Sequence, residues 1–149
     1  VELGAAHVVP FFSRYCVAAP KKEEQKNERY NRIALEAAKQ SGRAHVPEVR
    51  GAVSFEKALK RLEEEPFDLI LVAWEEEHAL PLSKAVEKYR QSHDELKRVL
   101  IVIGPEGGIT AREIAESGAK TVTLGARILR TETAAIAAAA IVMAVMGEI

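Results

Sequence analysis

A continuous apolar run followed at once by a glycine-rich turn stands at Val99–Thr110, which reads VLIVIGPEGGIT. The run does not alternate apolar with polar residues, and this pattern is typical of a parallel strand covered on both faces. A second run of the same kind, DLILVAW, lies at Asp68–Trp74. Together they predict an α/β structure, a mostly parallel sheet with helices on both faces.

Segments with helical periodicity alternate with these strands. Each is bounded by a capping residue, a glycine or a proline. The predicted helices are Glu23–Ser41 before Gly42, a helix capped by Ser54 and stopped by Pro66, a short helix with the capping-box pair Thr110 and Glu113 before Gly118, and the alanine-rich Thr131–Met146. The polar stretch between the two apolar runs is expected to be partly helical.

Two shorter strands complete the predicted sheet, at His7–Phe12 and Thr121–Leu124. Pro10 places the first of them near an edge or an irregularity, because proline cannot donate to a strand ladder. Val1–Gly4 is expected to be the end of a helix that Gly4 stops, with part of the native N-terminus missing before it.

The bulk composition indicates one globular domain. The chain has 149 residues, of which 48% are hydrophobic and 29% charged, and its formal net charge is -1. That charge argues against nucleic-acid binding over the whole surface. The single cysteine predicts a cytoplasmic protein without an intramolecular disulfide, and the apolar run at Ala134–Gly147 is shorter than the roughly 20 residues that cross a bilayer.

Ligands of parallel α/β sheets bind beyond the carboxyl ends of the strands, which directs attention to the turns after Trp74, Ile103 and Leu124. The turn at Gly104–Gly108, GPEGG, has neither the Lys-Ser or Lys-Thr ending of a P-loop nor GxGxxG spacing. Its glycines would let a ligand approach the main chain. From the glycines alone, a tight strand-to-helix turn is an equally good interpretation.

The segment Leu124–Ala135, LGARILRTETAA, contains a glycine turn and the start of a helix. Thr131 or Thr133 is expected to cap that helix, and Glu132 lies favourably at its positive end. Taken alone, Arg130 is better interpreted as a member of a surface or interface ion pair.

Taken together, these segments resemble the RsmE family of RNA methyltransferases, a branch of the SPOUT superfamily that modifies N3 of a uridine in small-subunit (16S) ribosomal RNA. The resemblance covers nearly the whole chain. The matching stretches are GPEGG at Gly104–Gly108, LG at Leu124–Gly125, ILRTETA at Ile128–Ala134 and EAAKQSGRAHVPEV at Glu36–Val49.

The resemblance implies that residues 1–149 form a trefoil-knotted domain that binds S-adenosylmethionine and forms a homodimer. It also implies an N-terminal RNA-binding barrel domain to which nothing in this sequence corresponds. The cofactor-binding residues carried over are Val72, Trp74, Glu75, Ile103, Gly104, Pro105, Glu106, Gly107, Gly108, Leu124, Gly125, Ile128 and Leu129.

The catalytic candidates are Arg130 and Glu132, and the candidates for contacts with ribosomal RNA are Arg14, Arg43 and Arg130. The family typically has an arginine two residues after the serine that corresponds to Ser13, a position that is tyrosine here. A solvated helix face explains the basic residues around Arg43 about as well as an RNA track does.

The remaining charged groups have simpler interpretations. Glu75, Glu76 and Glu77 are best interpreted as a solvated turn, except that Glu75 could lie near the positive sulfonium of the cofactor. No metal site is expected, because the histidines lack metal-ligand spacing. These are His7, His45, His78 and His93.

The sequence therefore predicts methyl transfer from S-adenosylmethionine to a uracil ring nitrogen in ribosomal RNA. Arg130 is the first candidate to stabilise the negative charge that develops on the base. Two alternatives stay open: a methyltransferase with another RNA target, such as a ribose hydroxyl, and a dimeric RNA-binding module without catalysis.

Overall fold

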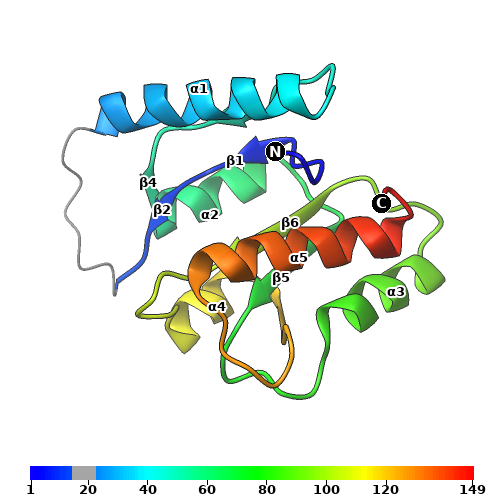
Figure 1. The fold of residues 1–149 in the computed structure, drawn as a ribbon. Coiled ribbons are helices and arrows are strands. Elements are labelled where there is room, and N and C mark those ends of the chain that lie inside the picture. The colour runs from blue at the N-terminus through cyan, green and yellow to red at the C-terminus, as the bar shows by residue number, and fades with distance from the viewer. Residues whose placement is uncertain (15–22) are drawn as a thin grey trace.

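The computed structural model describes residues 1–14 and 23–149. Helices and strands alternate along much of the chain (Figure 1). The elements are β1 His7–Val8, β2 Phe11–Phe12, α1 Glu23–Gln40, β3 Glu48–Val49, β4 Val53–Ser54, α2 Phe55–Glu64, β5 Leu69–Ala73, α3 Leu82–Ser92, β6 Val99–Ile103, α4 Ala111–Ser117, β7 Lys120–Val122 and α5 Thr131–Met146.

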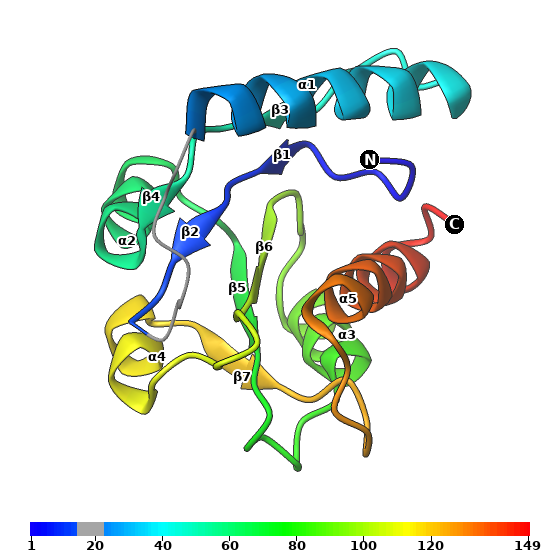
Figure 2. The ribbon, with the colours of Figure 1, turned by 60° about the vertical axis from the view of Figure 1, so that its left-hand side comes forward.

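The central sheet has three parallel strands in the order β6-β5-β7. Helices α3 and α5 cover one face, and α2 and α4 lie on the other (Figure 2). Leu71 of β5 packs into the cluster with α3 and α5, whereas its neighbour Val72 packs with Phe55 and Ile114 on the opposite face. Both β5 side chains are fully buried. The predicted parallel sheet with helices on both faces is confirmed.

The N-terminal strands form two further parallel pairs, β1 with β3 and β2 with β4. Helix α1 packs on β3 and lies above β1 in both views (Figures 1 and 2). The predicted strand His7–Phe12 is thus divided in two at Pro10, which accepts a hydrogen bond from the Val53 N–H but cannot donate one.

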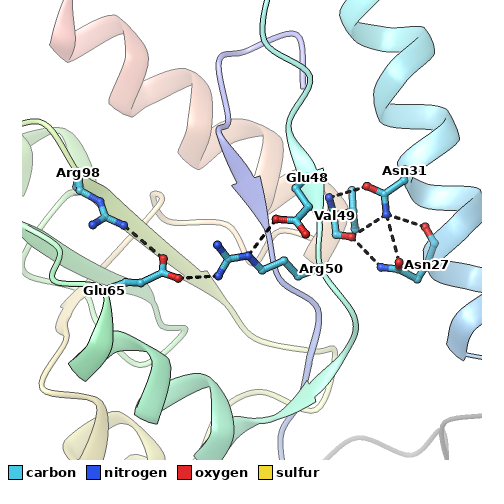
Figure 3. A network of polar contacts seen from close by, with 7 residues as sticks. All are labelled: Asn27, Asn31, Glu48, Val49, Arg50, Glu65 and Arg98. Atoms are coloured by element: carbon cyan, nitrogen blue, oxygen red, sulfur yellow. Dashed lines mark hydrogen bonds and ion pairs between the residues drawn. The ribbon is translucent and has the colours of Figure 1, made fainter.

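Helix α1 is joined to β3 by amide side chains (Figure 3). The Nδ2 groups of Asn27 and Asn31 each donate to the Val49 carbonyl over 2.7 Å, and the Val49 N–H donates to Asn31 Oδ1 over 3.0 Å. Both backbone groups of Val49 are therefore satisfied by α1 side chains, which fixes this helix against a strand too short to hold it by pairing alone.

A chain of charges continues from β3 to the start of β6 (Figure 3). Arg50 pairs with Glu48 at 3.4 Å and with Glu65 at 2.9 Å, and Glu65 also lies 3.5 Å from Arg98. The hydrogen bond from Arg50, with its positive charge, holds the pKa of Glu65 below its usual value. Because these side chains are partly exposed, each pair contributes only modestly to stability.

The first four residues form a hydrogen-bonded turn, and their origin as the end of a helix stays a prediction. The Gly4 N–H donates to the Val1 carbonyl over 2.9 Å, and Gly4 has a φ of +95°. A left-handed glycine serves a turn as well as it serves a helix end, and the sequence signal is the same for both. Within the part of the chain that the structure describes, no helix is both long and apolar enough to span a membrane.

Candidate functional site

The carboxyl ends of the three central strands meet at one edge of the sheet. Ala73 of β5 pairs with Ile103 of β6 on one side and with Val122 of β7 on the other. Because the strands are parallel, the turns that follow these residues leave the same edge. Figure 2 shows the turns after β5 and β7 at the lower end of the sheet. The predicted gathering of three turns is confirmed.

The glycine-rich turn after β6 is tightly folded. The Gly108 N–H donates to the Pro105 carbonyl over 2.8 Å, and Gly108 has a φ of +78°. At Gly104, a Cβ would lie 2.9 Å from Cγ1 of the buried Ile109. Glycine is therefore required at Gly108 by the backbone conformation and at Gly104 by the packing of the loop on itself.

Helix α4 follows this turn and begins with the predicted capping box. The Glu113 N–H donates to Thr110 Oγ1 over 3.1 Å, and the Thr110 N–H donates to Glu113 Oε2 over 2.9 Å. The left-handed Gly118 ends the helix. The capping box thus fixes the direction in which the chain leaves the glycine-rich turn.

The segment after β2 is held against the same turn. Ser13 is buried, and its hydroxyl donates to the Gly108 carbonyl over 3.4 Å, while the Arg14 N–H donates to Glu113 Oε1 over 3.1 Å. The predicted RNA-binding residue Arg14 therefore lies beside the glycine-rich turn, with an exposed side chain. Tyr15, the departure from the family pattern, lies outside the described residues.

Both oxygens of Glu113 are thus in use. Partial burial raises the pKa of Glu113, but the hydrogen bonds from the Thr110 and Arg14 N–H groups and from the Thr110 hydroxyl outweigh it, so the pKa is below its usual value. The carboxylate accordingly stays charged at neutral pH. One side chain joins the start of α4 to the segment after β2.

The turn after β5 contains one glutamate with a structural role. Glu77 Oε1 accepts hydrogen bonds from the Ala79 N–H at 2.7 Å and the Leu80 N–H at 3.2 Å, and its Oε2 accepts from the Thr121 hydroxyl at 2.8 Å. The hydrogen bond from the Ala79 N–H, with those from Thr121 and Leu80, lowers the pKa of Glu77. Glu77 thus ties this partly exposed turn to β7, a role that its interpretation as part of a solvated turn did not include.

Trp74 and Glu75 begin the same turn. The Trp74 N–H donates to the Val122 carbonyl over 3.1 Å, and its half-buried side chain packs against the core on the α2 and α4 side. The Glu75 side chain reaches the glycine-rich turn: a Cβ placed on Gly108 would lie 3.0 Å from Glu75 Oε1. The turns after β5 and β6 are therefore in direct contact.

The turn after β7 leads into α5. Gly125 has a φ of +118°, and the Thr123 hydroxyl bonds both to its N–H, at 3.1 Å, and to its carbonyl, at 3.2 Å. A Cβ on Gly125 would meet no atom within 4 Å, so its main chain faces open space. Ile128 further along is 88% exposed.

Helix α5 begins without the predicted threonine cap. Arg130 is the N-cap residue, and no side chain bonds the helix start. The Thr131 hydroxyl instead donates to the Gly104 carbonyl over 3.2 Å. The prediction of Thr131 or Thr133 as cap is wrong, because Arg130 is the N-cap residue and the Thr131 hydroxyl bonds the turn after β6 instead.

The comparisons with known proteins agree with this arrangement. Residues 1–143 match the family model described as RNA methyltransferase domain. The chain belongs to this family. It is 41% identical over 138 residues to a Bacillus subtilis protein named ribosomal RNA small subunit methyltransferase E, covering 89% of this chain and 53% of that protein. The protein of the same name from Mesomycoplasma hyopneumoniae is 31% identical over 143 residues, covering 91% of this chain and 57% of that protein. The chain thus spans about half the length of the curated relatives it matches.

Solved structures of similar proteins carry the same fold. The ribosomal RNA small subunit methyltransferase E of Neisseria gonorrhoeae, bound to S-adenosylmethionine, is 32% identical with a TM-score of 0.75, covering 95% of this chain and 57% of that one. A putative methyltransferase of Legionella pneumophila, in complex with the same cofactor, is 32% identical with a TM-score of 0.75, covering 96% and 57%. The methyltransferase family predicted from the sequence is confirmed.

Most of the site residues predicted from the family resemblance lie on the three turns. Val72 differs, because its fully buried side chain belongs to the core on the α2 and α4 side. Arg43 lies elsewhere: its Nη1 donates to the carbonyls of Val1 at 2.7 Å and Ala5 at 2.8 Å, and its Nη2 to Gly4 at 3.4 Å. The structure thus gives Arg43 a role in fixing the first turn, while its contact with RNA stays a prediction.

Ser13 and Thr131 were missed as residues that join the turns. Neither the buried Ser13 hydroxyl nor the Thr131 hydroxyl has a local sequence signal for its partner, because Gly108 and Gly104 lie far away along the chain. Arg130 and Glu132, the predicted catalytic residues, are both exposed at the start of α5. They are connected to the glycine-rich turn through Thr131.

Proposed function

We propose that this chain is the S-adenosylmethionine-binding domain of an enzyme that methylates N3 of a uridine in small-subunit ribosomal RNA. One observation carries the proposal: the turns after β5, β6 and β7 contact one another at one sheet edge, through Glu75 at Gly108 and through Thr131 at Gly104. Relatives named as ribosomal RNA methyltransferases, and similar structures crystallised with this cofactor, support it.

The residues at this edge fit such a cofactor. Gly107 is exposed, and Gly125 presents its main chain to open space. N–H and C=O groups of such turns can bind an adenine ring and a ribose without side chains in the way. When bound, S-adenosylmethionine would supply a methyl group on a positively charged sulfur.

The protein's part in the reaction is mainly to position the base. A uracil N3 must lose its proton, and the resulting negative charge spreads onto the ring oxygens. Arg130 is exposed beside the glycine-rich turn, where its guanidinium would stabilise this charge, and Glu132 is the second catalytic candidate. A base presented to this site has to be unstacked from its neighbours.

Contacts with RNA would be shared with the rest of a longer protein. The chain covers 53% of the Bacillus subtilis relative, and we assign the family's RNA-binding barrel to the remainder. Within this chain, Arg14 beside the glycine-rich turn is the better RNA candidate, because among the described residues its exposed guanidinium has no hydrogen bonds like those of Arg43. With ribosomal RNA as its substrate, the enzyme would act in the cytoplasm.

The trefoil knot is part of the proposal. Strand β5 lies between β6 and β7, yet α5, which follows β7, packs on β6. Residues 123–130, which connect β7 to α5, therefore pass the end of β5. Residues 74–81 leave the sheet at that same end and lead to α3, on the face that α5 also covers (Figure 2). Connections that pass one another at one edge are rare in proteins, and this arrangement supports a knot.

A homodimer built on α5 is also proposed. Ala134, Ala138 and Val142 of α5 are buried within the chain, but Ile136 is 63% exposed and Ile128 is 88% exposed. We take these large exposed side chains, one on α5 and one in the segment before it, as support for an interface there. Sedimentation at micromolar concentration should show a dimer that Ile136→Glu converts to a monomer; a monomeric wild-type chain would contradict this.

Two measurements test the function. Calorimetric titration with S-adenosylmethionine should show one binding site per chain, and absence of binding would favour an RNA-binding module without catalysis. Nucleoside analysis of small-subunit RNA, after incubation with the enzyme, should show 3-methyluridine. A methylated ribose or another base would keep the cofactor and change the target.

A further inference from the structure

Within the described residues, Glu75 is a carboxylate without a hydrogen-bond or ion-pair partner at the edge where the three turns meet. Glu75 is exposed and both of its oxygens approach the buried Gly108, Oε1 at 3.0 Å and Oε2 at 3.6 Å from the position of a Cβ there. Among residues 1–14 and 23–149, no group forms a hydrogen bond or ion pair with this carboxylate. A charge left unpaired against a ligand-binding turn is available for a positively charged ligand.

The neighbouring glutamates show that this placement is particular to Glu75. Glu77 uses both oxygens to fix the turn, with bonds to Ala79, Leu80 and Thr121. Glu76 lies exposed between them and forms no hydrogen bond or ion pair with any described residue. Of the three, Glu75 alone combines a free carboxylate with a contact to Gly108.

We propose that the Glu75 carboxylate faces the positively charged sulfonium of S-adenosylmethionine and makes the site prefer the cofactor over its product. This rests on the function proposed above. In methyl transfer a bond forms between the methyl carbon and the uracil nitrogen, whose proton has been lost. The methyl–sulfur bond breaks, and sulfur keeps the electron pair. The product, S-adenosylhomocysteine, is a neutral thioether, so it gains nothing from a negative charge at this position.

The size of the preference follows from Coulomb attraction. A unit charge pair about 5 Å apart at a water-accessible site is worth roughly a factor of five to ten in affinity. Such a factor would help the product leave, because S-adenosylhomocysteine would lose the attraction as soon as the methyl group is transferred. The carboxylate would therefore set specificity without itself taking part in bond making.

The test is calorimetric titration of the wild-type chain, Glu75→Gln and the control Glu76→Gln with three ligands. S-adenosylmethionine and sinefungin carry a positive charge at the reacting position, and S-adenosylhomocysteine does not. Glu75→Gln should weaken the two charged ligands by about five- to tenfold and the neutral product by less than about twofold. Glu76→Gln, which removes the same charge one residue away, should leave all three affinities within about twofold.

The possible outcomes separate the inference from the function. A wild-type chain that binds none of these ligands would remove the proposed function. If the wild-type chain binds these ligands and Glu75→Gln weakens all three equally, the carboxylate contacts the α-amino group that they share. That result would overturn the inference. Unchanged affinities would overturn it as well. Thermal unfolding of each variant, and Glu75→Asp as a variant that keeps the charge, show whether a loss comes from misfolding.

Discussion

The hydroxyl of Thr131, the first residue of α5, donates a hydrogen bond to the carbonyl of Gly104, the first residue after β6, over 3.2 Å. Gly104 begins the stretch GPEGG and Thr131 lies within the stretch ILRTETA, two of the stretches that carry the family resemblance. Strand β7 lies between them in the sequence but on the other side of β5 in the sheet. The bond therefore holds the start of α5 at the glycine-rich turn after the chain has crossed the sheet edge.

Thr131→Val should loosen this connection without changing the volume of the side chain. The Gly104 carbonyl would lose its partner, which costs about 1 kcal/mol and lowers the melting temperature by roughly 2–4 °C. S-adenosylmethionine affinity should fall about fivefold, because binding would have to align the two turns again. Thr133→Val, an exposed change two residues later, is the matched control for calorimetry and thermal unfolding. Equal effects of the two variants would contradict the role given to Thr131.

Gly108→Ala should weaken cofactor binding more than it weakens the fold. A Cβ at this φ of +78° costs about 1 kcal/mol and would lie 3.0 Å from Glu75 Oε1, so the flexible glutamate must move. Gly118→Ala is the control, because Gly118 has a φ of +62° and open space around its Cβ position. The two variants should lose similar stability, while only Gly108→Ala lowers S-adenosylmethionine affinity, by about tenfold. Similar affinities in both would separate Gly108 from the site.

Glu113→Gln should destabilise the chain by about 1 kcal/mol at pH 7. The carboxylate accepts from Thr110 with one oxygen and from the Arg14 N–H with the other, and an amide offers only one acceptor oxygen. Because the pKa of Glu113 is lowered from 4.5 in the folded chain, its charge stabilises the fold above that pH. This stabilisation is lost as the pH falls through the lowered pKa.

Denaturant unfolding at several pH values checks this prediction. The difference between wild type and Glu113→Gln should be largest near neutral pH and shrink below about pH 4.5, the ordinary value from which the pKa is lowered. Glu116→Gln is the control on the same helix, since Glu116 pairs only with Arg112 at an exposed position. A difference that does not depend on pH would mean that Glu113 acts through its shape and not through its charge.

The sequence predicted the elements whose signals are local. The bounds of β6 and α5 agree with the predicted Val99–Ile103 and Thr131–Met146. Both have clear ends: a glycine follows β6 at Gly104, and the left-handed Gly147 follows α5. The gathering of the three turns was also predictable, because parallel strands place their carboxyl ends at one edge.

What the sequence did not predict depends on partners far along the chain. Strands β3 and β4 have two residues each and are defined by their pairing with β1 and β2. Such short strands have no periodic sequence pattern that predicts them. Arg43 was a candidate for RNA, yet its guanidinium bonds three carbonyls of the first turn. A side chain that bonds distant backbone groups looks the same in the sequence as one that faces solvent.

The role proposed for Arg130 can be separated from a general attraction to RNA. Arg130 and Arg127 are both exposed in the segment between β7 and α5, three positions apart, so each would add one positive charge near a bound RNA. Only Arg130 stands next to Thr131 and hence beside the glycine-rich turn. An arginine that stabilises charge on the base acts in the transition state, whereas one that contacts phosphate acts on binding.

Arg130→Ala should therefore lower the maximal rate of methyl incorporation into small-subunit RNA by about 100-fold, the usual cost of losing one group that stabilises developing charge. S-adenosylmethionine affinity should stay within about twofold, because the turns that hold the cofactor are unchanged. Arg127→Ala should raise the RNA concentration needed for half-maximal rate and leave the maximal rate nearly unchanged. If saturating RNA restores the rate of Arg130→Ala, then Arg130 only helps to bind RNA. The charge on the base must then be stabilised by another group, such as main-chain N–H groups of the three turns.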